Sequence, residues 1–406
     1  MSSILSSAAQ GRARDLPILV GTSSAHFLND LAQSLLIASY PLLRGDFSLD
    51  FTQLGFLTLA NQVTASVLQP VIGIWADRKP RPWSLAGGMS ITCLGLLLLA
   101  WAQSYVVLLA ASVLLGLGSA IFHPEAARAA RRSSGGRHGL AQSIFQLGGH
   151  AGSALGPLML ALFVLPRGQS ALAWFAPLMA AGIVLLAVIG RWTHHAAVTG
   201  GTVPLAGRHD RPGASAVPVR EPVREIAILL ALIAAKFSYL ACFENYFVFY
   251  LGTRFGTSIA EGQIVLFVFL GASALGGIVG GHLTDRVGTR AMIVFSFWGA
   301  LPFSLAVPYL GPELAIIAAI FAGAILASAF SAIVVHAQTL MPHRIGMVSG
   351  LFFGAAFGVG GLAAAALGVV ADGYGVEVLY RIASWLPLAG LLTIFLNRPA
   401  RAIATG

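Results

Sequence analysis

The chain of 406 residues is 57% hydrophobic and only 10% charged, and its mean hydropathy is +0.82. Soluble domains are roughly 45–50% apolar and about 25% charged, so this composition excludes an ordinary soluble protein and a disordered chain. The two cysteines lie in apolar runs and predict neither a disulfide framework nor a metal cluster. The net charge of +9 comes from arginines in short loops, a pattern that favours a membrane protein over a nucleic-acid-binding protein.

Apolar stretches long enough to cross a membrane, about 20 residues each, follow one another along the chain. They lie at 16–42, 51–76, 82–124 (two spans), 139–166, 168–190, 226–253, 262–284, 291–312, 314–343, 345–371 and 376–397. We therefore predict an all-α membrane protein with twelve transmembrane helices.

A long polar stretch rich in Gly, Pro and Arg divides these spans into six and six. We expect a cytoplasmic N-terminal tail (1–15), an N-terminal six-helix bundle (16–191), a cytoplasmic linker (192–224), a C-terminal six-helix bundle (225–397) and a cytoplasmic tail (398–406). Most of the 24 lysines and arginines lie in loops on the side of the two tails, whereas the opposite side has only Arg44, Arg167 and Arg254. The positive-inside rule therefore places both termini in the cytoplasm.

The two halves repeat each other. Residues 73–78 read Gly-Ile-Trp-Ala-Asp-Arg after the second span, and residues 281–286 read Gly-His-Leu-Thr-Asp-Arg after the eighth. The openings of the fifth and eleventh spans match at nearly the same offset. Parallel repeats of this kind form two bundles around an axis along the membrane normal, with the binding site between them.

The chain resembles the major facilitator superfamily, whose signature loop is similar to residues 73–81, although Pro80 stands where a small or basic residue is usual. Three stretches resemble the fosmidomycin-resistance group of efflux proteins: His26-Phe-Leu-Asn-Asp30-x-x-Gln33-Ser34, Ile121-Phe-His-Pro-Glu-Ala-Ala-Arg128, and residues 139–150. The resemblance implies proton-coupled export of small toxic compounds across the inner membrane of a bacterium. It also implies gating residues at Gly73, Asp77, Arg78, Arg81, Asp285 and Arg286. The alternative is that these acidic and basic residues only mark cytoplasmic turns and have no role in gating.

Ionisable side chains within membrane spans are costly and are therefore candidates for function. Asp30 has His26 at i−4 and Gln33 at i+3, which places all three on one helix face. A carboxyl group at this depth favours its neutral form and is the leading candidate for carrying a proton. The alternative is a permanently protonated, structural hydrogen bond. His26, His123 and Glu125 are candidate proton relays. Alternatively, Glu125 and Arg128 form an ion pair at the helix end.

The remaining candidates for substrate binding are polar residues of the spans. Lys236 would attract an anionic group and pair with Glu244, or extend its ammonium to the interface. The full set of substrate-binding candidates is Asn29, Gln33, Tyr40, Arg128, Gln142, Gln146, His150, Lys236, Tyr239, Glu244, Asn245 and His336. The two histidines and the glutamine pair have an alternative role as hydrogen-bonding residues between helices.

Glycines recur every four residues in the fifth and eleventh spans, which suits a sliding interface between the halves or static packing. Gly152-x-x-x-Gly156-Pro157 resembles part of an antiporter signature, and we include these three residues among the gating candidates.

We expect a secondary transporter that acts as a monomer, with protons, a small molecule and the lipid bilayer as its partners and no nucleic acid. No phosphate-loop or hydrolase motif occurs, so we expect neither an enzyme nor a cofactor. Two alternatives remain open. One is uptake of a small organic anion. The other is transport of a divalent metal or metal chelate, held by His26, Asp30, His123 and Glu125 if these converge.

Overall fold

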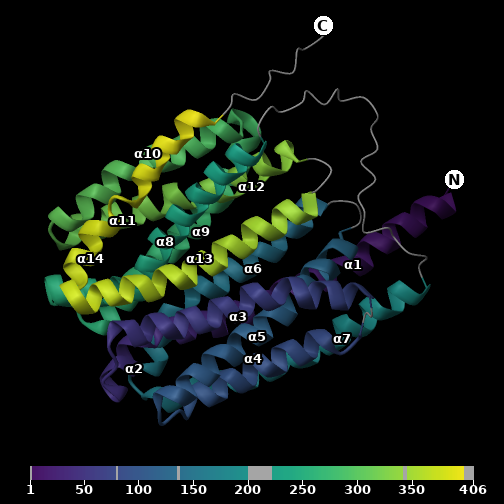
Figure 1. The fold of residues 1–406 in the computed structure, drawn as a ribbon. Coiled ribbons are helices and arrows are strands. Elements are labelled where there is room, and N and C mark those ends of the chain that lie inside the picture. Colours follow the sequence, from purple (N-terminus) through teal and green to yellow (C-terminus); the bar gives the residue numbers. More distant parts are fainter. Residues whose placement is uncertain (1, 79–80, 135–137, 200–221, 342–344, 397–406) are drawn as a thin grey trace, which may run out of the picture.

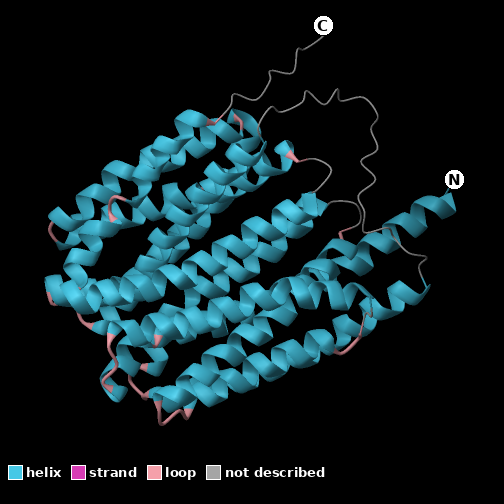
Figure 2. Ribbon diagram, viewed as in Figure 1, coloured by secondary structure: helices cyan, strands magenta, loops and turns pink. Residues whose placement is uncertain are grey.

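A computed structural model describes residues 2–78, 81–134, 138–199, 222–341 and 345–396. The side chains at 2–15, 73–78, 138–140, 195–199, 222, 345–346 and 349 lie outside the description. Within the described ranges, every regular element is a helix (Figure 2). The predicted gating residues Gly73, Asp77 and Arg78 therefore lie outside the residues whose side chains are described.

The N-terminal half forms the purple-to-teal part of Figure 1 and the C-terminal half the green-to-yellow part. The first half contains α1 (Ser2–Ala38), α2 (Tyr40–Phe47), α3 (Phe51–Arg78), α4 (Ser84–Ala100), α5 (Tyr105–Arg132), α6 (His138–Met159), a π-helical turn (Leu160–Val164), a 3-10 helix (Gln169–Phe175) and α7 (Ala176–Thr199). The second half contains α8 (Pro222–Phe255), α9 (Ile259–Val287), α10 (Thr289–Ala306), a 3-10 turn (Val307–Tyr309), α11 (Pro312–Ala327), α12 (Ala329–Leu340), α13 (Ile345–Tyr374), α14 (Val376–Ala383) and a 3-10 helix (Leu386–Phe395).

Nine helical segments among the described residues are long and apolar enough to cross a membrane, and α4 is apolar but shorter. Helices α1 and α3 are not among the nine. Both contain polar residues that lower their hydropathy, such as Asp30 in α1 and Asn61 in α3. The all-helical membrane fold is confirmed, whereas the twelve-span count, the cytoplasmic termini and the bundle boundaries stay predictions.

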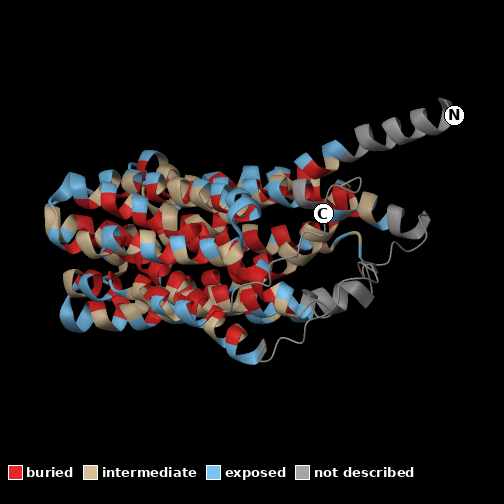
Figure 3. Cartoon of the chain, turned by 90° about the horizontal axis from the view of Figure 1, so that it is seen from above, coloured by how far each residue is buried: buried red, intermediate tan, exposed pale blue. Residues whose placement is uncertain are grey.

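The outer surface is apolar, as expected for a surface in contact with lipid. Val106 and Trp174 are 75% and 72% exposed, and many other large apolar side chains are exposed with them. Buried residues instead follow the helix faces that turn toward one another (Figure 3). A soluble protein rarely exposes so much contiguous apolar surface. The outer faces of the helices are therefore suited to the bilayer.

The two halves pack closely at one end, where α3 lies against α13 and α6 against α9 (Figure 1). A Cβ atom added to Gly55 would lie 2.6 Å from the carbonyl oxygen of Ala364, and one added to Gly361 would lie 2.9 Å from Cβ of Gln62. Gln263 also donates to the carbonyl oxygen of Ala38 at 2.7 Å. This closed end is the one that the charge pattern predicts to be external.

Toward the opposite end the contacts along α13 become sparse. A Cβ atom at Gly350 or Gly354 would meet no described atom within 4 Å. The glycines of α6 do not line this interface. A Cβ atom at Gly152 would collide with the backbone oxygen of Phe27, and one at Gly156 would collide with the hydroxyl of Ser34. The prediction that the α6 glycines form the sliding surface between halves is therefore corrected, because that helix face packs against α1 of the same half.

Candidate transport cavity

A cavity of about 200 Å³ lies between the two halves. Its walls come from α1, α3, α5 and α6 on one side and from α8, α9 and α13 on the other. Most of the lining residues are either apolar or uncharged polar residues, and two are carboxylic acids. The polar residues of the wall include Asp30, Gln33, Asn61, His123, Glu244 and Asn245.

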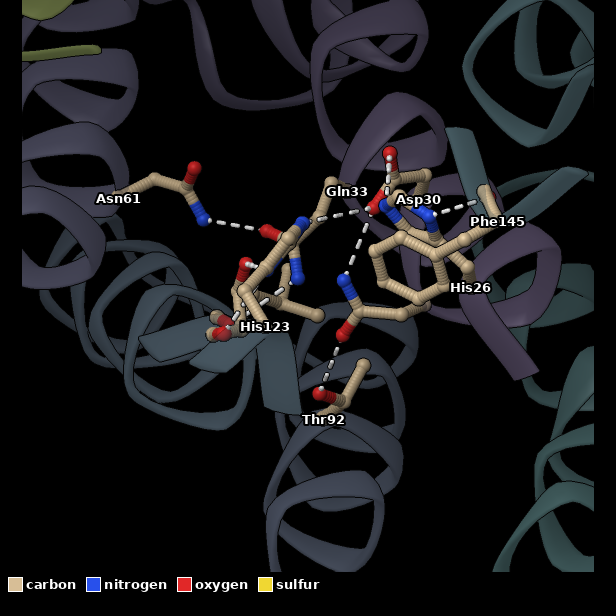
Figure 4. A network of polar contacts seen from close by, with 10 residues as sticks. His26, Asp30, Gln33, Asn61, Thr92, His123 and Phe145 are labelled. Atoms are coloured by element: carbon tan, nitrogen blue, oxygen red, sulfur yellow. Dashed lines mark hydrogen bonds and ion pairs between the residues drawn. The ribbon is translucent and has the colours of Figure 1, made fainter. Parts of the chain in front are cut away.

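Asp30 lies at the centre of a compact polar cluster (Figure 4). Its carboxylate is 3.3 Å from Nε2 of His26 and 3.7 Å from Nε2 of His123. Asn29 donates its amide to the same carboxylate at 3.0 Å. The side chain of Asp30 is 19% exposed and that of His123 is 21% exposed. The carboxyl group therefore faces the cavity rather than lipid or a sealed helix contact.

Backbone carbonyls orient both imidazoles. Nδ1 of His26 lies 2.8 Å from the carbonyl oxygen of Phe145, and Nδ1 of His123 lies 3.0 Å from that of Ser119. A carbonyl oxygen only accepts, so each Nδ1 donates its hydrogen, and the tautomer follows from the partner. In a neutral ring Nε2 then has a lone pair, which the carboxylate of Asp30 would repel. A proton bound at Nε2 of His26, 3.3 Å from the carboxylate, converts that contact into a charge-assisted hydrogen bond.

Helix α6 closes tightly over this cluster at Gly149. A Cβ atom there would lie 2.5 Å from Cε1 of His26 and 2.8 Å from Oδ2 of Asp30. The ring of His26 also stacks on Phe145 of the same helix, with ring centroids 4.1 Å apart. Gly149 is not among the residues predicted from the sequence, although the Gly148-Gly149 pair is a signal that another helix approaches closely.

The predicted residues Asn29 and Gln33 occupy different positions around Asp30. Asn29 is fully buried, and its oxygen accepts from Thr92 of α4 at 3.4 Å. This bond orients the amide group that donates to Asp30. Gln33 lines the cavity and donates to the carbonyl oxygen of Leu115 at 3.0 Å. Its oxygen accepts from Asn61 of α3 at 2.8 Å. These bonds fix the two amides in place.

Sequence analysis missed the contribution of α3 to the cavity. Thr58, Asn61, Gln62 and Gln69 all line it. The signal was present, because Thr58, Gln62, Ala65 and Gln69 recur at helical spacing along one face of an otherwise apolar span.

Across the cavity, Glu244 of α8 is half-buried and lines the wall. The neighbouring Asn245 accepts from the hydroxyl of Thr58 at 2.5 Å, which joins the two halves. Tyr40 lies 2.7 Å from the same hydroxyl but is buried beyond the cavity. Asn245 thus lines the cavity and Tyr40 lies at the closed end, and their predicted roles in substrate binding stay predictions.

Lys236 does not pair with Glu244 and does not extend to the interface. It is buried, and Nζ donates to the carbonyl oxygen of Ala327 at 3.2 Å, where α11 ends. The ring of Phe330 lies 4.9 Å from the same atom. Tyr239 is buried against Phe243 and does not line the cavity. The expected Lys236–Glu244 pair is corrected, because two turns of helix separate the two residues and Lys236 turns toward the junction of α11 and α12.

Glu125 also lies outside the Asp30 cluster. It accepts from Ser84 at 2.7 Å, and its other oxygen is 3.9 Å from Arg128. Glu125, Arg128 and Arg81 line a second, small pocket. The four ligands of the metal alternative therefore do not converge in this structure. The ligand atoms of His26, Asp30 and His123 lie within 4.8 Å of one another, and Glu125 is not part of that group.

Most of the other candidates lie away from the cavity wall. Gln142 and His150 are exposed and Gln146 is half-buried. His336 is buried, with Nδ1 2.9 Å from Thr289. Pro157 lines the cavity, and Asp285 and Arg286 are exposed. Their predicted roles stay predictions.

The sequence profile of the Major Facilitator Superfamily matches residues 22–365. The chain is 48% identical over 384 residues to the Fosmidomycin resistance protein of Escherichia coli (strain K12), covering 93% of this chain and 92% of the relative. It is 38% identical over 380 residues to the uncharacterized MFS-type transporter YfnC of Bacillus subtilis (strain 168), covering 94% and 92%.

Solved structures share the fold at much lower sequence identity. The nucleoside transporter NupG matches with a TM-score of 0.70 and 12% identity, over 94% of this chain and 100% of that chain. A bacterial homologue of the human lysosomal transporter Spinster, in an inward-facing and unoccupied conformation, matches with a TM-score of 0.69 and 16% identity, over 95% of each chain. Both likenesses concern the fold alone.

Proposed function

This chain belongs to the Major Facilitator Superfamily and is a multi-pass protein of the bacterial inner membrane, and from that premise we propose that it exports small toxic compounds in exchange for protons. The relationship to a fosmidomycin resistance protein at 48% identity makes fosmidomycin the first compound to test. Export requires a cavity that collects its substrate from the cytoplasm and a group that exchanges protons with that cavity.

The observation that carries the proposal is the position of Asp30 between two imidazoles at the cavity wall. The tautomer of His26 favours a bound proton between its Nε2 atom and the carboxylate, 3.3 Å away, and Nε2 of His123 lies 3.7 Å from the other carboxylate oxygen. The same carboxylate has access to the cavity, through which that proton can leave. A group that binds a proton in one conformation and releases it in another supplies the coupling that antiport needs.

The packing of the two halves fits a first step of export in which the substrate enters from the cytoplasm. The halves contact each other at the end predicted to be external, whereas a Cβ atom at Gly350 or Gly354, toward the end predicted to be cytoplasmic, would meet no described atom within 4 Å. Tilting of the two halves would then expose the same cavity outside. The direction of proton movement, rather than this conformation, distinguishes export from uptake.

The proposal is tested in proteoliposomes that contain a pH-sensitive dye and an imposed pH gradient. Addition of fosmidomycin should drive proton flux through the wild-type protein and through Asp46→Asn, a control at an exposed carboxyl group of α2. Asp30→Asn should give no substrate-driven flux. Substrate-driven proton flux at the wild-type rate in Asp30→Asn would refute the role of Asp30 in proton coupling. Substrate movement with the proton, rather than against it, would indicate uptake.

A further inference from the structure

Three side chains with metal-ligating atoms converge beside the cavity from two helices. His26 and Asp30 lie one turn apart on α1, and His123 lies on α5. One ligand atom from each of the three lies within 4.8 Å of the other two. Within the described part of the chain, no other group of three or more histidine, cysteine or acidic side chains converges in this way. A cation held by side chains would therefore bind at this cluster.

Backbone carbonyls orient the two imidazoles as they do in many metal sites. Nδ1 of His26 donates to the carbonyl oxygen of Phe145, and Nδ1 of His123 donates to that of Ser119. A metal-binding histidine usually donates its second nitrogen in this way, which leaves Nε2 as the ligand atom. Asn29 gives the carboxylate equivalent support, because its amide donates to Oδ1 of Asp30 at 3.0 Å. The lone pairs of both rings thus lie beside a carboxylate whose orientation is also fixed.

One proton does not bridge both of these contacts. A proton at Nε2 of His26 forms a hydrogen bond with the carboxylate over 3.3 Å. Nε2 of His123 lies 3.7 Å from the other carboxylate oxygen, which is longer than a hydrogen bond. A nitrogen lone pair and a carboxylate that face each other without a hydrogen atom between them repel. A cation held between them replaces this repulsion by attraction.

The spacing of the ligand atoms is close to that of a zinc site. Zinc–nitrogen and zinc–oxygen bonds of about 2.0–2.2 Å place neighbouring ligand atoms of a tetrahedral ion about 3.3–3.6 Å apart. The two contacts of Asp30 are 3.3 and 3.7 Å long. The ligand atoms of the two histidines lie within 4.8 Å of each other, so small rotations of the rings close the site. Two imidazoles and a carboxylate suit Zn²⁺, Co²⁺ or Ni²⁺, whereas Mg²⁺ and Ca²⁺ prefer oxygen ligands alone.

We propose that His26, Asp30 and His123 form a binding site for a divalent transition-metal ion such as Zn²⁺, with one coordination position open to the cavity. Asp30 and His123 line the cavity with side chains that are 19% and 21% exposed, so the ion has a path to the site. Three protein ligands leave the fourth position of a tetrahedral ion to water or to an oxygen atom of another ligand. A bound dication adds positive charge to the cavity, which is compatible with an anionic phosphonate as the exported compound.

The inference goes beyond the proposed function. The ion and the exchanging proton use the same lone pairs, so they exclude each other. Protein that holds a metal ion at this site therefore does not exchange a proton at Asp30, and the site is a place where the ion acts on the coupling machinery.

The test uses purified full-length protein without a histidine tag, because such a tag itself binds metal ions. Binding of Zn²⁺ is measured by isothermal titration calorimetry. Binding of Co²⁺ is measured by visible absorption, which is intense for a four-coordinate ion and weak for an octahedral one. We expect one tight site for each of these ions, a four-coordinate Co²⁺ spectrum, and no binding of Mg²⁺ at the same concentrations.

His26→Gln, Asp30→Asn and His123→Gln should each weaken Zn²⁺ binding about 100-fold or more. Each removes a ligand, and loss of an outer hydrogen-bonding partner alone typically costs about 10–100-fold in affinity. His282→Gln removes an exposed histidine of α9 outside the cluster and should leave the tight site unchanged. Thermal melting without metal shows whether each variant folds. A wild-type protein without the four-coordinate Co²⁺ spectrum, or wild-type Zn²⁺ affinity in a folded His123→Gln protein, would overturn the inference.

These outcomes are separate from those of the exporter proposal, because metal binding is measured without substrate and without a pH gradient. If Zn²⁺ binds at the cluster while substrate-driven proton flux survives in Asp30→Asn, the metal site stands and the role of Asp30 in proton coupling fails. If Asp30→Asn abolishes the flux and the wild-type protein binds no Zn²⁺, the exporter proposal stands and the metal site fails.

Discussion

The carboxylate of Asp372 accepts two hydrogen bonds from Thr52, at 2.7 Å from the backbone amide and 2.6 Å from the hydroxyl. Asp372 lies near the end of α13 in the C-terminal half, and Thr52 lies in the first turn of α3 in the N-terminal half. Its other oxygen accepts from the amide of Phe51 at 2.9 Å. One half thus caps a helix of the other, at the positive end of its dipole.

This cap holds the predicted external end closed, so its removal should favour opening at that end. We expect Asp372→Ala to cost the closed state about 1–2 kcal/mol, a factor of roughly 5–30 in population. The measurement is labelling of Gln62→Cys, in the cavity wall, by a membrane-impermeant maleimide added outside cells. Cys93 and Cys242 are replaced by alanine in the background.

Asp50, which directly precedes α3, provides a matched control at the same helix N-terminus. Asp50 also accepts from an α3 backbone amide, that of Gln53 at 2.6 Å, but within one half. Asp50→Ala should lower helix stability and leave the labelling rate unchanged. Equal labelling in the two variants would show that Asp372 does not hold the halves together.

His123 and Glu125 are two residues apart on α5, yet the structure separates their roles. His123 faces Asp30, whereas Glu125 bonds to Ser84. We expect His123→Gln to reduce substrate-driven proton flux about tenfold or more, because the carboxylate loses one of its two proton-sharing partners. Glu125→Gln should keep the wild-type ratio of protons to substrate. The assay is the same dye-loaded proteoliposome, and a greater loss in Glu125→Gln would contradict the geometry.

Gly149 should be more sensitive to a methyl group than Gly354. Alanine at Gly149 places Cβ against His26 and Asp30, so we expect loss of coupling and a destabilisation of about 1–3 kcal/mol from overpacking. Alanine at Gly354 meets open space in this conformation and should leave the melting temperature unchanged. Both quantities follow from thermal melting and proton flux of the purified variants. Wild-type proton coupling in a stable Gly149→Ala protein would show that α6 can shift to accommodate the methyl group without disturbing Asp30.

A large side chain at Gly354 should also impair closing of the end that is predicted to be cytoplasmic. Gly354→Trp is expected to bind substrate from the cytoplasmic side but not to complete transport, since the halves must approach there when the cavity turns outward. The test compares substrate binding with substrate flux in the same preparation. Normal flux in this variant would place the closing contact elsewhere on α13.

Local sequence was sufficient to predict what depends on composition and helical spacing. So few charges over so long a chain require lipid as the solvent, and the polar positions of the first span identify the side that faces away from it. The i, i+4 spacing of His26 and Asp30 places both on one helix face, and in the structure Nε2 of His26 lies 3.3 Å from the carboxylate. The family resemblance is confirmed in the same way, because its motifs are local.

What only the tertiary structure decided is which helix each face meets. The glycines of α6 have the spacing of a sliding surface, yet they pack against α1, whereas Gly55 and Gly361 bring the halves together. Lys236 and Glu244 share a helix and have different neighbours, and Asp372 caps a helix more than 300 residues earlier in the chain. Periodicity determines the direction of a side chain on its own helix, but a partner is determined by the packing of two bundles, which no single helix encodes.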